Sequence, residues 1–455
     1  MLKFNYVVLS IFLLFGCKKK DPELKQSSKP NIIFLLTDDQ RWDALGATGN
    51  TILKTPNIDE LAEEGQLYMN SYVTTSICMV SRASILSGQY ESKHGINDFF
   101  TSFTKEDFDS TYPALLKKNG YRTGFVGKYG VGNPKDQPKE AFNFWAVTPL
   151  HQPNYENKDK DGNYIHYTEL LSQHIDEFLN GANEKPFCLS VSFKSPHSQD
   201  GDPRQFIPNP KYADHYKNDI IPLPETANPI YWDALPDFFH SDENIARQRW
   251  KLRFETQEKY QESVKNYYRL ITGVDDAVAK LREELKEKGL DKNTIIIFMG
   301  DNGFYLGEHG LAGKWFGHEE SIRVPLIVYD PRHKPSKSKV ENIGLNIDIA
   351  PTILGYAGVD KPAGMQGIDL SKKNNSRQDF FYEHTFEGSP KLPKVEGVVS
   401  PTTKYMIYIE HGYEELFDLI KDSNETKNLV SDPNYKQLLE TQRRRYQVLK
   451  LEVKK

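Results

Sequence analysis

A thiol and a guanidinium lie four residues apart in the stretch that begins at Cys78 and ends at Gly88. The apolar pair Ile85 and Leu86 and the glycine that follows predict a short helix whose N-terminus lies at Cys78. Free N–H groups and a partial positive charge at that end would hold an anionic group, and Arg82 would offer a fork for its oxygens. The alternative is a buried cysteine at a helix start with no chemical role.

Two apolar runs rich in branched residues, 31–36 and 294–299, are typical of strands buried on both faces of a parallel sheet. Each run leads directly into side chains that carry oxygen donors: Asp38, Asp39, Asp301 and Asn302. Ligands bind at the carboxyl ends of strands in open α/β sheets. If the two strands are neighbours, four oxygen ligands surround one hard cation, which relieves the repulsion between adjacent carboxylates. For either pair alone, a solvated turn is the simpler interpretation.

Two further candidates follow predicted strands, and a third lies in a long segment. Lys128 comes after a strand at 121–126, and His197 comes after a strand at 186–193, where an imidazole can act as an acid or base. Taken alone, each residue is more often structural. Residues 200–255 show little periodicity and contain a basic and aromatic cluster with Arg249, which is suited to an anionic sugar chain or to the exposed face of a helix.

The composition excludes some classes of function. The chain has 455 residues, 38% of them hydrophobic, with 58 basic and 63 acidic side chains. This length predicts one large domain and a smaller one, and the near-neutral balance argues against nucleic-acid binding. A polyanionic substrate would therefore be met by local Lys and Arg.

The N-terminus predicts export. Lys3 precedes an apolar run of about ten residues, too short for a membrane span, that ends at Gly16-Cys17. We expect a signal peptide at residues 1–16, a lipid on Cys17 that anchors the protein to a bacterial membrane in the periplasm or at the cell surface, and a charged tether at 17–29. An ordinary signal peptide is the alternative. Of the three cysteines, Cys17 would carry the lipid and Cys188 lies in a predicted buried strand, so no disulfide framework is expected.

Strands and helices alternate along residues 30–370, which predicts an α/β domain. After about residue 370, short strands alternate with charged turns and a charged helix ends the chain, so residues 371–455 predict a small antiparallel sheet plus a helix.

The stretch from Cys78 to Gly88 resembles the signature of the type I sulfatases, Cys-x-Pro-Ser-Arg followed by x-x-x-Leu-Thr-Gly. Val80 stands at the Pro position and Ser87 at the Thr position. The likeness extends over most of the chain, through Asp301 to Gly310, Glu319 to Leu326 and Glu415 to Leu419.

The resemblance implies an alkaline-phosphatase-like fold, with a large mixed sheet between helices and a smaller C-terminal antiparallel sheet. It implies that a formylglycine-generating or anaerobic maturation enzyme converts Cys78 to formylglycine, which is the catalytic residue. Ca²⁺ would be bound by Asp38, Asp39, residue 78, Asp301 and Asn302. The remaining catalytic side chains would be Arg82, Lys128, His197 and Lys314, and substrate contacts are assigned to His94, Arg249 and His309.

One position departs from the family pattern Gly-Lys-Trp-His-x-Gly, whose histidine assists release of sulfate. Here the run is Gly127-Lys128-Tyr129-Gly130-Val131-Gly132, and Gly130 cannot take a proton. The leading hypothesis is a calcium-dependent sulfatase that acts on a sulfated poly- or oligosaccharide. The alternatives are a phosphatase or phosphonate hydrolase of the same superfamily, and a lipoprotein that binds sulfated glycan without turnover.

Overall fold

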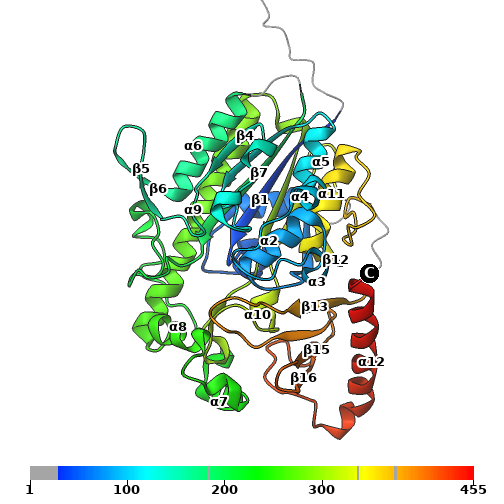
Figure 1. Ribbon diagram of the computed structural model, residues 1–455. Coiled ribbons are helices and arrows are strands. Elements are labelled where there is room, and N and C mark those ends of the chain that lie inside the picture. The colour runs from blue at the N-terminus through cyan, green and yellow to red at the C-terminus, as the bar shows by residue number, and fades with distance from the viewer. Residues whose placement is uncertain (1–28, 182–184, 336–337, 373–376) are drawn as a thin grey trace, which may run out of the picture.

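The computed structural model describes residues 29–181, 185–335, 338–372 and 377–455. A large sheet lies at its centre (Figure 1) and is formed by β1 (Asn31–Asp38), β2 (Gln66–Tyr72), β3 (Arg122–Gly127), β4 (Phe144–Val147), β7 (Phe187–Pro196), β8 (Thr294–Gly300), β11 (Leu326–Tyr329) and β12 (Lys339–Leu345). The strand order is β12-β2-β11-β8-β1-β7-β3-β4. β11 is antiparallel to both of its neighbours and the other pairs are parallel, so the sheet is mixed.

Helices cover both faces of the sheet (Figure 1). In β1, Ile33 and Leu35 face one core and Ile32 and Phe34 face the other, as the two-residue period of a strand requires. The first core is closed by α1 (Pro56–Glu64), α6 (Tyr167–Asn180) and α9 (Gln257–Glu287). The second is closed by α2 (Cys78–Ser87), α5 (Tyr112–Lys118) and α11 (Ile349–Ala357). Burial on both faces explains the continuous apolar runs.

A four-stranded antiparallel sheet lies beside the large one and carries the last helix (Figure 1). Its elements are β13 (Phe380–His384), β14 (Val395–Val399), β15 (Thr403–Tyr408), β16 (Tyr413–Asp418) and α12 (Lys436–Val453). Fully buried Lys404 of this sheet pairs at 2.8 Å with both Glu425 and Glu319, the first residue of α10 (Glu319–Ile322). The predicted fold class, a large mixed sheet between helices with a smaller antiparallel sheet and a helix, is confirmed.

The segment 200–255 is mainly irregular, as predicted, but contains α7 (Pro229–Asp233) and α8 (Ile245–Arg253). The other elements are short: α3 (Glu91–His94), α4 (Lys105–Asp109), β5 (Glu156–Lys158), β6 (Tyr164–His166), β9 (Tyr305–Leu306) and β10 (Ala312–Gly313). Sequence reasoning missed β2, β4 and β12. The outer strand β12 is exposed over its first half, so its residues lack an apolar run.

The predicted signal peptide, the lipid-bearing Cys17 and residues 17–28 of the tether lie outside the described residues. Within the described ranges, no helix is long and apolar enough to cross a membrane. Cys188 lies buried in β7 and, like Cys78, is a free thiol.

Candidate active site

The site forms where four neighbouring strands end. β8, β1, β7 and β3 are adjacent and parallel, so the residues that follow them meet at one edge of the sheet. Asp38 ends β1, Lys128 follows β3, His197 follows β7, and Asp301 follows β8. The predicted neighbourhood of the strands 31–36 and 294–299 is correct, because β1 pairs with β8 along its length.

Hydrogen bonds directly join the pair Asp38 and Asp39 to the pair Asp301 and Asn302. The backbone N–H of Asp39 donates to Asp301 Oδ1 at 3.0 Å, and Asn302 Nδ2 donates to Asp39 Oδ1 at 2.7 Å. Asp39 has a φ of 65°, in the left-handed region, which is uncommon for a residue other than glycine. Such backbone conformations cluster at functional sites, where surrounding contacts hold them in place.

Three buried cations neutralise the three carboxylates. Lys128 Nζ bonds Asp38 Oδ2, and Lys314 Nζ bonds Asp39 Oδ1. Arg82 donates to Asp301 Oδ2 from Nε at 2.9 Å and pairs with it through Nη2 at 2.8 Å. All six side chains are almost completely buried, so each charge depends on its partner.

Burial and neighbouring charges shift the pKa values of the two strand-end carboxyls in opposite directions. Burial would raise the pKa of Asp38, but the neighbouring positive charges, of which Lys128 has the largest effect, outweigh it and hold this pKa well below its usual range. Burial raises the pKa of Asp301 to about 7, and the charge of Asp38 adds to that shift. Two close carboxylates with such different pKa values form a strongly polarised site.

Cys78 is the first residue of α2, as predicted, and lies beside this cluster. Its side chain is 5% exposed, and it lines a cleft together with Lys128, His197 and Lys314. Burial raises the pKa of the Cys78 thiol despite the nearby lysines. An unmodified thiol at this position is therefore protonated at neutral pH and a weak nucleophile.

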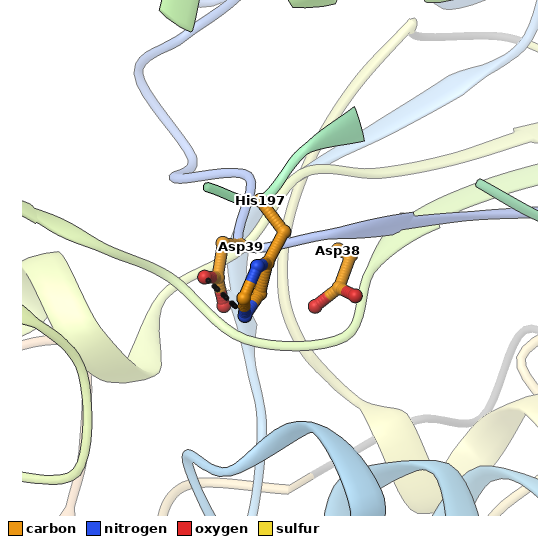
Figure 2. A group of neighbouring side chains, drawn as sticks. All are labelled: Asp38, Asp39 and His197. Carbon is orange, nitrogen blue, oxygen red and sulfur yellow. Dashed lines mark ion pairs between the residues drawn. The ribbon is translucent and has the colours of Figure 1, made fainter. Parts of the chain in front are cut away.

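His197 is fixed by three polar neighbours. Its Nδ1 lies 2.6 Å from the Ser198 carbonyl, and its Nε2 lies 3.3 Å from Gln152 Nε2 and 3.5 Å from Asp39 Oδ2. Figure 2 shows the imidazole beside Asp39, with Asp38 next to both. Burial lowers the pKa of His197 to about 4 even though Asp39 opposes the shift, so the ring is neutral at pH 7.

The cleft has a volume of about 340 Å³ and two kinds of wall. The polar side chains are Lys128, His151, Gln152, His197, Asp200, Arg249, Lys314 and Ser389. The larger apolar ones are Phe99, Phe100, Trp315, Phe386 and Leu392. The last two belong to the loop between β13 and β14, so the small sheet contributes part of the wall. Cations beside aromatic rings suit a sugar that carries an anionic group.

Of the predicted substrate contacts, the structure brings Arg249 into the cleft, where it pairs with Asp200 at 3.3 Å and lies over the Trp315 ring. His94 and His309 are not among the residues that line it. His94 accepts from or donates to Ser84 Oγ at 3.0 Å and accepts from the N–H of Ile96. His309 stacks on His318 with ring centroids 4.4 Å apart. Both histidines are held by their neighbours in the fold.

The oxygen donors fit a hard cation. Asp38 Oδ1 and Asn302 Oδ1 are buried and have no hydrogen-bond partner among the described residues. Ligand atoms of Asp38, Asp39 and His197 lie within 4.8 Å of one another. Buried acceptors without donors are costly, and a divalent ion with oxygen ligands would satisfy them.

Sequence reasoning missed Gln152, His151, Asp200 and Trp315. The first two lie in an irregular segment between β4 and β5, and no pattern there predicts contact with the strand ends. Only the position of Trp315 directly after Lys314 gave a signal.

The described geometry agrees with comparisons to known proteins. The sulfatase family model matches residues 30–359, and a model described as N-sulphoglucosamine sulphohydrolase, C-terminal, matches residues 307–452. An N-acetylglucosamine-6-O-sulfatase of Bacteroides thetaiotaomicron is 27% identical, over 94% of this chain and 88% of that protein.

Two solved structures share the fold. One is a protein in complex with its substrate D-glucosamine-2-N,6-O-disulfate, with a TM-score of 0.79, 24% identity and coverage of 94% of this chain and 98% of the other. The second is the phosphonate monoester hydrolase of Agrobacterium radiobacter, with a TM-score of 0.78, 21% identity and coverage of 93% and 96%. The match of the family model to most of the chain shows that this protein belongs to the sulfatase family of sulfuric ester hydrolases.

Proposed function

We propose that this protein hydrolyses sulfate esters on a carbohydrate, with formylglycine made from Cys78 as the nucleophile and Ca²⁺ bound beside it. The observation that carries the proposal is the position of Cys78 at the first residue of a buried helix, in one cleft with Lys128, His197 and Lys314. A hydrated aldehyde at this position would supply two hydroxyls, one to attack sulfur and one to allow sulfate to leave.

The calcium ligands in this proposal are Asp38, Asp39, Asp301 and Asn302, together with residue 78. The partnerless oxygens of Asp38 and Asn302 support it, and oxygen-only ligation suits calcium. When bound, the ion would neutralise charge on the sulfate group and on the nucleophile.

The remaining roles are stabilisation of negative charge, sulfate binding and protonation of the alcohol, and we assign them to four side chains at the site. Lys128 and Arg82 lie near the N-terminus of α2 and would hold the hydroxyls of residue 78 and stabilise negative charge. Lys314 would bind a sulfate oxygen as a permanent cation, because the charge of Asp39 keeps its pKa raised in spite of burial. His197 lines the same cleft, and it would protonate the alcohol that leaves after the anionic sulfate group, once bound, raises the pKa of the ring.

The cleft supports a sugar substrate. Trp315 and Phe386 offer flat apolar surfaces, and Arg249 can meet a second anionic group, so a sulfated amino sugar or uronate fits the chemistry of the walls. Curated relatives include an N-acetylglucosamine-6-O-sulfatase and an ulvan-active sulfatase, which act on sulfated carbohydrates by name.

The test is expression in a host that makes formylglycine, followed by a screen of defined sulfated mono- and oligosaccharides. Mass analysis of the peptide around residue 78 should find an aldehyde in place of the thiol. Sulfate release should require calcium and should be absent in Cys78→Ala. An unmodified Cys78 in protein from the native host, together with tight binding of sulfated glycan, would favour the binding lipoprotein instead.

A phosphonate or phosphate ester hydrolase is the second candidate, because a phosphonate monoester hydrolase has the same fold. Relative kcat/KM values on aryl sulfate, aryl phosphate and aryl phosphonate separate the two. A preference for the phosphorus esters by the modified protein would overturn the sulfatase assignment.

We also propose export and lipid attachment at Cys17, on the grounds of the sequence alone. Metabolic labelling with a fatty-acid analogue tests this, with Cys17→Ser as the variant that should lose the label. Label retained by Cys17→Ser would contradict it.

A further inference from the structure

A histidine that sequence reasoning did not single out lies in the wall of the cleft. His151 belongs to the irregular segment between β4 and β5 and lines the same cavity as Cys78, Lys128 and Gly130. Its ring packs edge-on against Phe100, with centroids 5.9 Å apart. The side chain is half-buried and faces the open space of the cleft.

The cationic groups that line the cleft or lie directly behind it are engaged as donors. Lys128 and Lys314 each bond a carboxylate oxygen, and Arg82 donates to Asp301 and to the Lys128 carbonyl. Ammonium and guanidinium groups held by carboxylates have no lone pair to accept a proton. These side chains stabilise negative charge but do not act as bases.

The other neutral imidazole is also engaged. His197 uses Nδ1 on the Ser198 carbonyl and Nε2 on Gln152 and Asp39. By contrast, neither ring nitrogen of His151 has a hydrogen-bond partner among the described residues. In the cleft, His151 is therefore the imidazole with a free lone pair.

The loop after β3 is poorly suited to carry the base at position 130, which is a glycine. This residue has a φ of 67°, and an added Cβ would lie 2.9 Å from Arg82 Cδ and 3.3 Å from Lys128 Cε. A side chain at this position would be strained and would displace the two cations. A base in another wall of the cleft avoids that strain.

We infer that His151 is the proton acceptor that allows residue 78 to release sulfate, an inference that rests on the proposed function. After transfer, residue 78 would carry one hydroxyl and one sulfate ester on the same carbon. His151 would take the proton of that hydroxyl, its oxygen would form the C=O bond, and the C–O bond to sulfate would break, with the electron pair leaving on sulfate. The aldehyde is restored, and no oxidant or reductant is needed.

The electrostatic environment agrees with this role. Burial lowers the pKa of His151 below its usual value, and the charge of Lys128 adds to the shift. The imidazole is thus unprotonated at neutral pH and able to accept a proton.

The test compares purified, formylglycine-containing wild type with His151→Asn and with His333→Asn, a histidine whose side chain is 77% exposed and which lies outside the cleft. Rapid mixing with an aryl sulfate should give His151→Asn a burst of about one equivalent of phenol, followed by turnover about 10²-fold slower or more. Mass analysis should then find sulfate retained on the peptide of residue 78. Wild type and His333→Asn should turn over steadily without retained sulfate.

A second variant separates proton transfer from binding. His151→Ala should regain turnover on addition of imidazole, which a loss of substrate contacts would not allow. If modified His151→Asn turns over within about threefold of wild type and retains no sulfate, the role of His151 is wrong while the proposed function stands. If wild type carries no aldehyde and releases no sulfate, the proposed function fails and this role fails with it.

Discussion

Replacing Lys128 by methionine should destabilise the protein in a way that depends on calcium. The Lys128 side chain is 2% exposed and its ammonium bonds the buried carboxylate of Asp38. Removal of one partner from a buried ion pair leaves an uncompensated charge and costs about 3–5 kcal/mol. A divalent ion at Asp38 would supply positive charge in its place, so we expect the loss to be full in EDTA and clearly smaller in saturating calcium.

The pH dependence of this loss follows from the pKa of Asp38. That pKa lies below its ordinary value in the folded protein, so the ion pair contributes stability above the unfolded-state pKa of about 4 and loses it as the pH falls further. Without the charge of Lys128, burial is less strongly opposed and the pKa of Asp38 rises. The difference in stability between wild type and Lys128→Met should therefore shrink on acidification.

Urea unfolding followed by tryptophan fluorescence, at several pH values with EDTA or calcium, measures these differences. Lys105→Met is the matched control, because Lys105 pairs with Asp109 at 3.1 Å with a side chain that is 92% exposed, and such pairs contribute less than about 1 kcal/mol. An equal loss for Lys128→Met in EDTA and in calcium, or a loss no larger than that of the control, would refute the reasoning.

Three further changes test other parts of the molecule. Asn302→Leu removes a partnerless buried oxygen and should weaken calcium binding, measured by calorimetry, while Asn57→Leu, whose amide bonds Asp275 and none of the site oxygens, should leave the calcium affinity unchanged. Arg249→Met should lower kcat/KM by about 10-fold for substrates with a second anionic group and leave small aryl sulfates nearly unaffected; equal losses on both would contradict a specificity role. Glu91 is buried beside Glu383 and burial raises its pKa to about 8, so its proton is retained on folding and stability falls as the pH rises from about 4.5 to 8. Glu91→Gln should flatten that part of a melting-temperature profile, and an unchanged slope would be the contrary result.

The side chains at the ends of β1 and β8 and at the start of α2 could be predicted from the sequence. The strands that became β1 and β8 are buried on both faces, which requires continuous apolar runs, and the polar residues that follow such runs mark the carboxyl edge of the sheet. The helix beginning at Cys78 was predicted for a similar reason, since apolar residues and a terminal glycine define it locally. The family signature assigned roles to these residues, but the expectation that they lie close together did not depend on it.

The walls of the cleft could not be predicted. His151 and Gln152 come from an irregular segment, Asp200 from a loop, and Phe386 from the loop between β13 and β14, and no periodic pattern relates these residues to Cys78. The sequence also assigned His94 and His309 to the substrate, but neither histidine is among the residues that line the cleft. Local sequence does not show which residues reach the cleft.

The amino-acid sequence by itself determined which residues follow the central strands, because local apolar runs and strand direction decide where polar side chains emerge. Only the tertiary structure decided what faces them across the cleft. Contacts between segments as distant as Phe99 and Phe386, whose rings pack 5.0 Å apart, depend on how the two sheets lie together. Such contacts are set by the packing of the whole chain and have no counterpart in any local pattern.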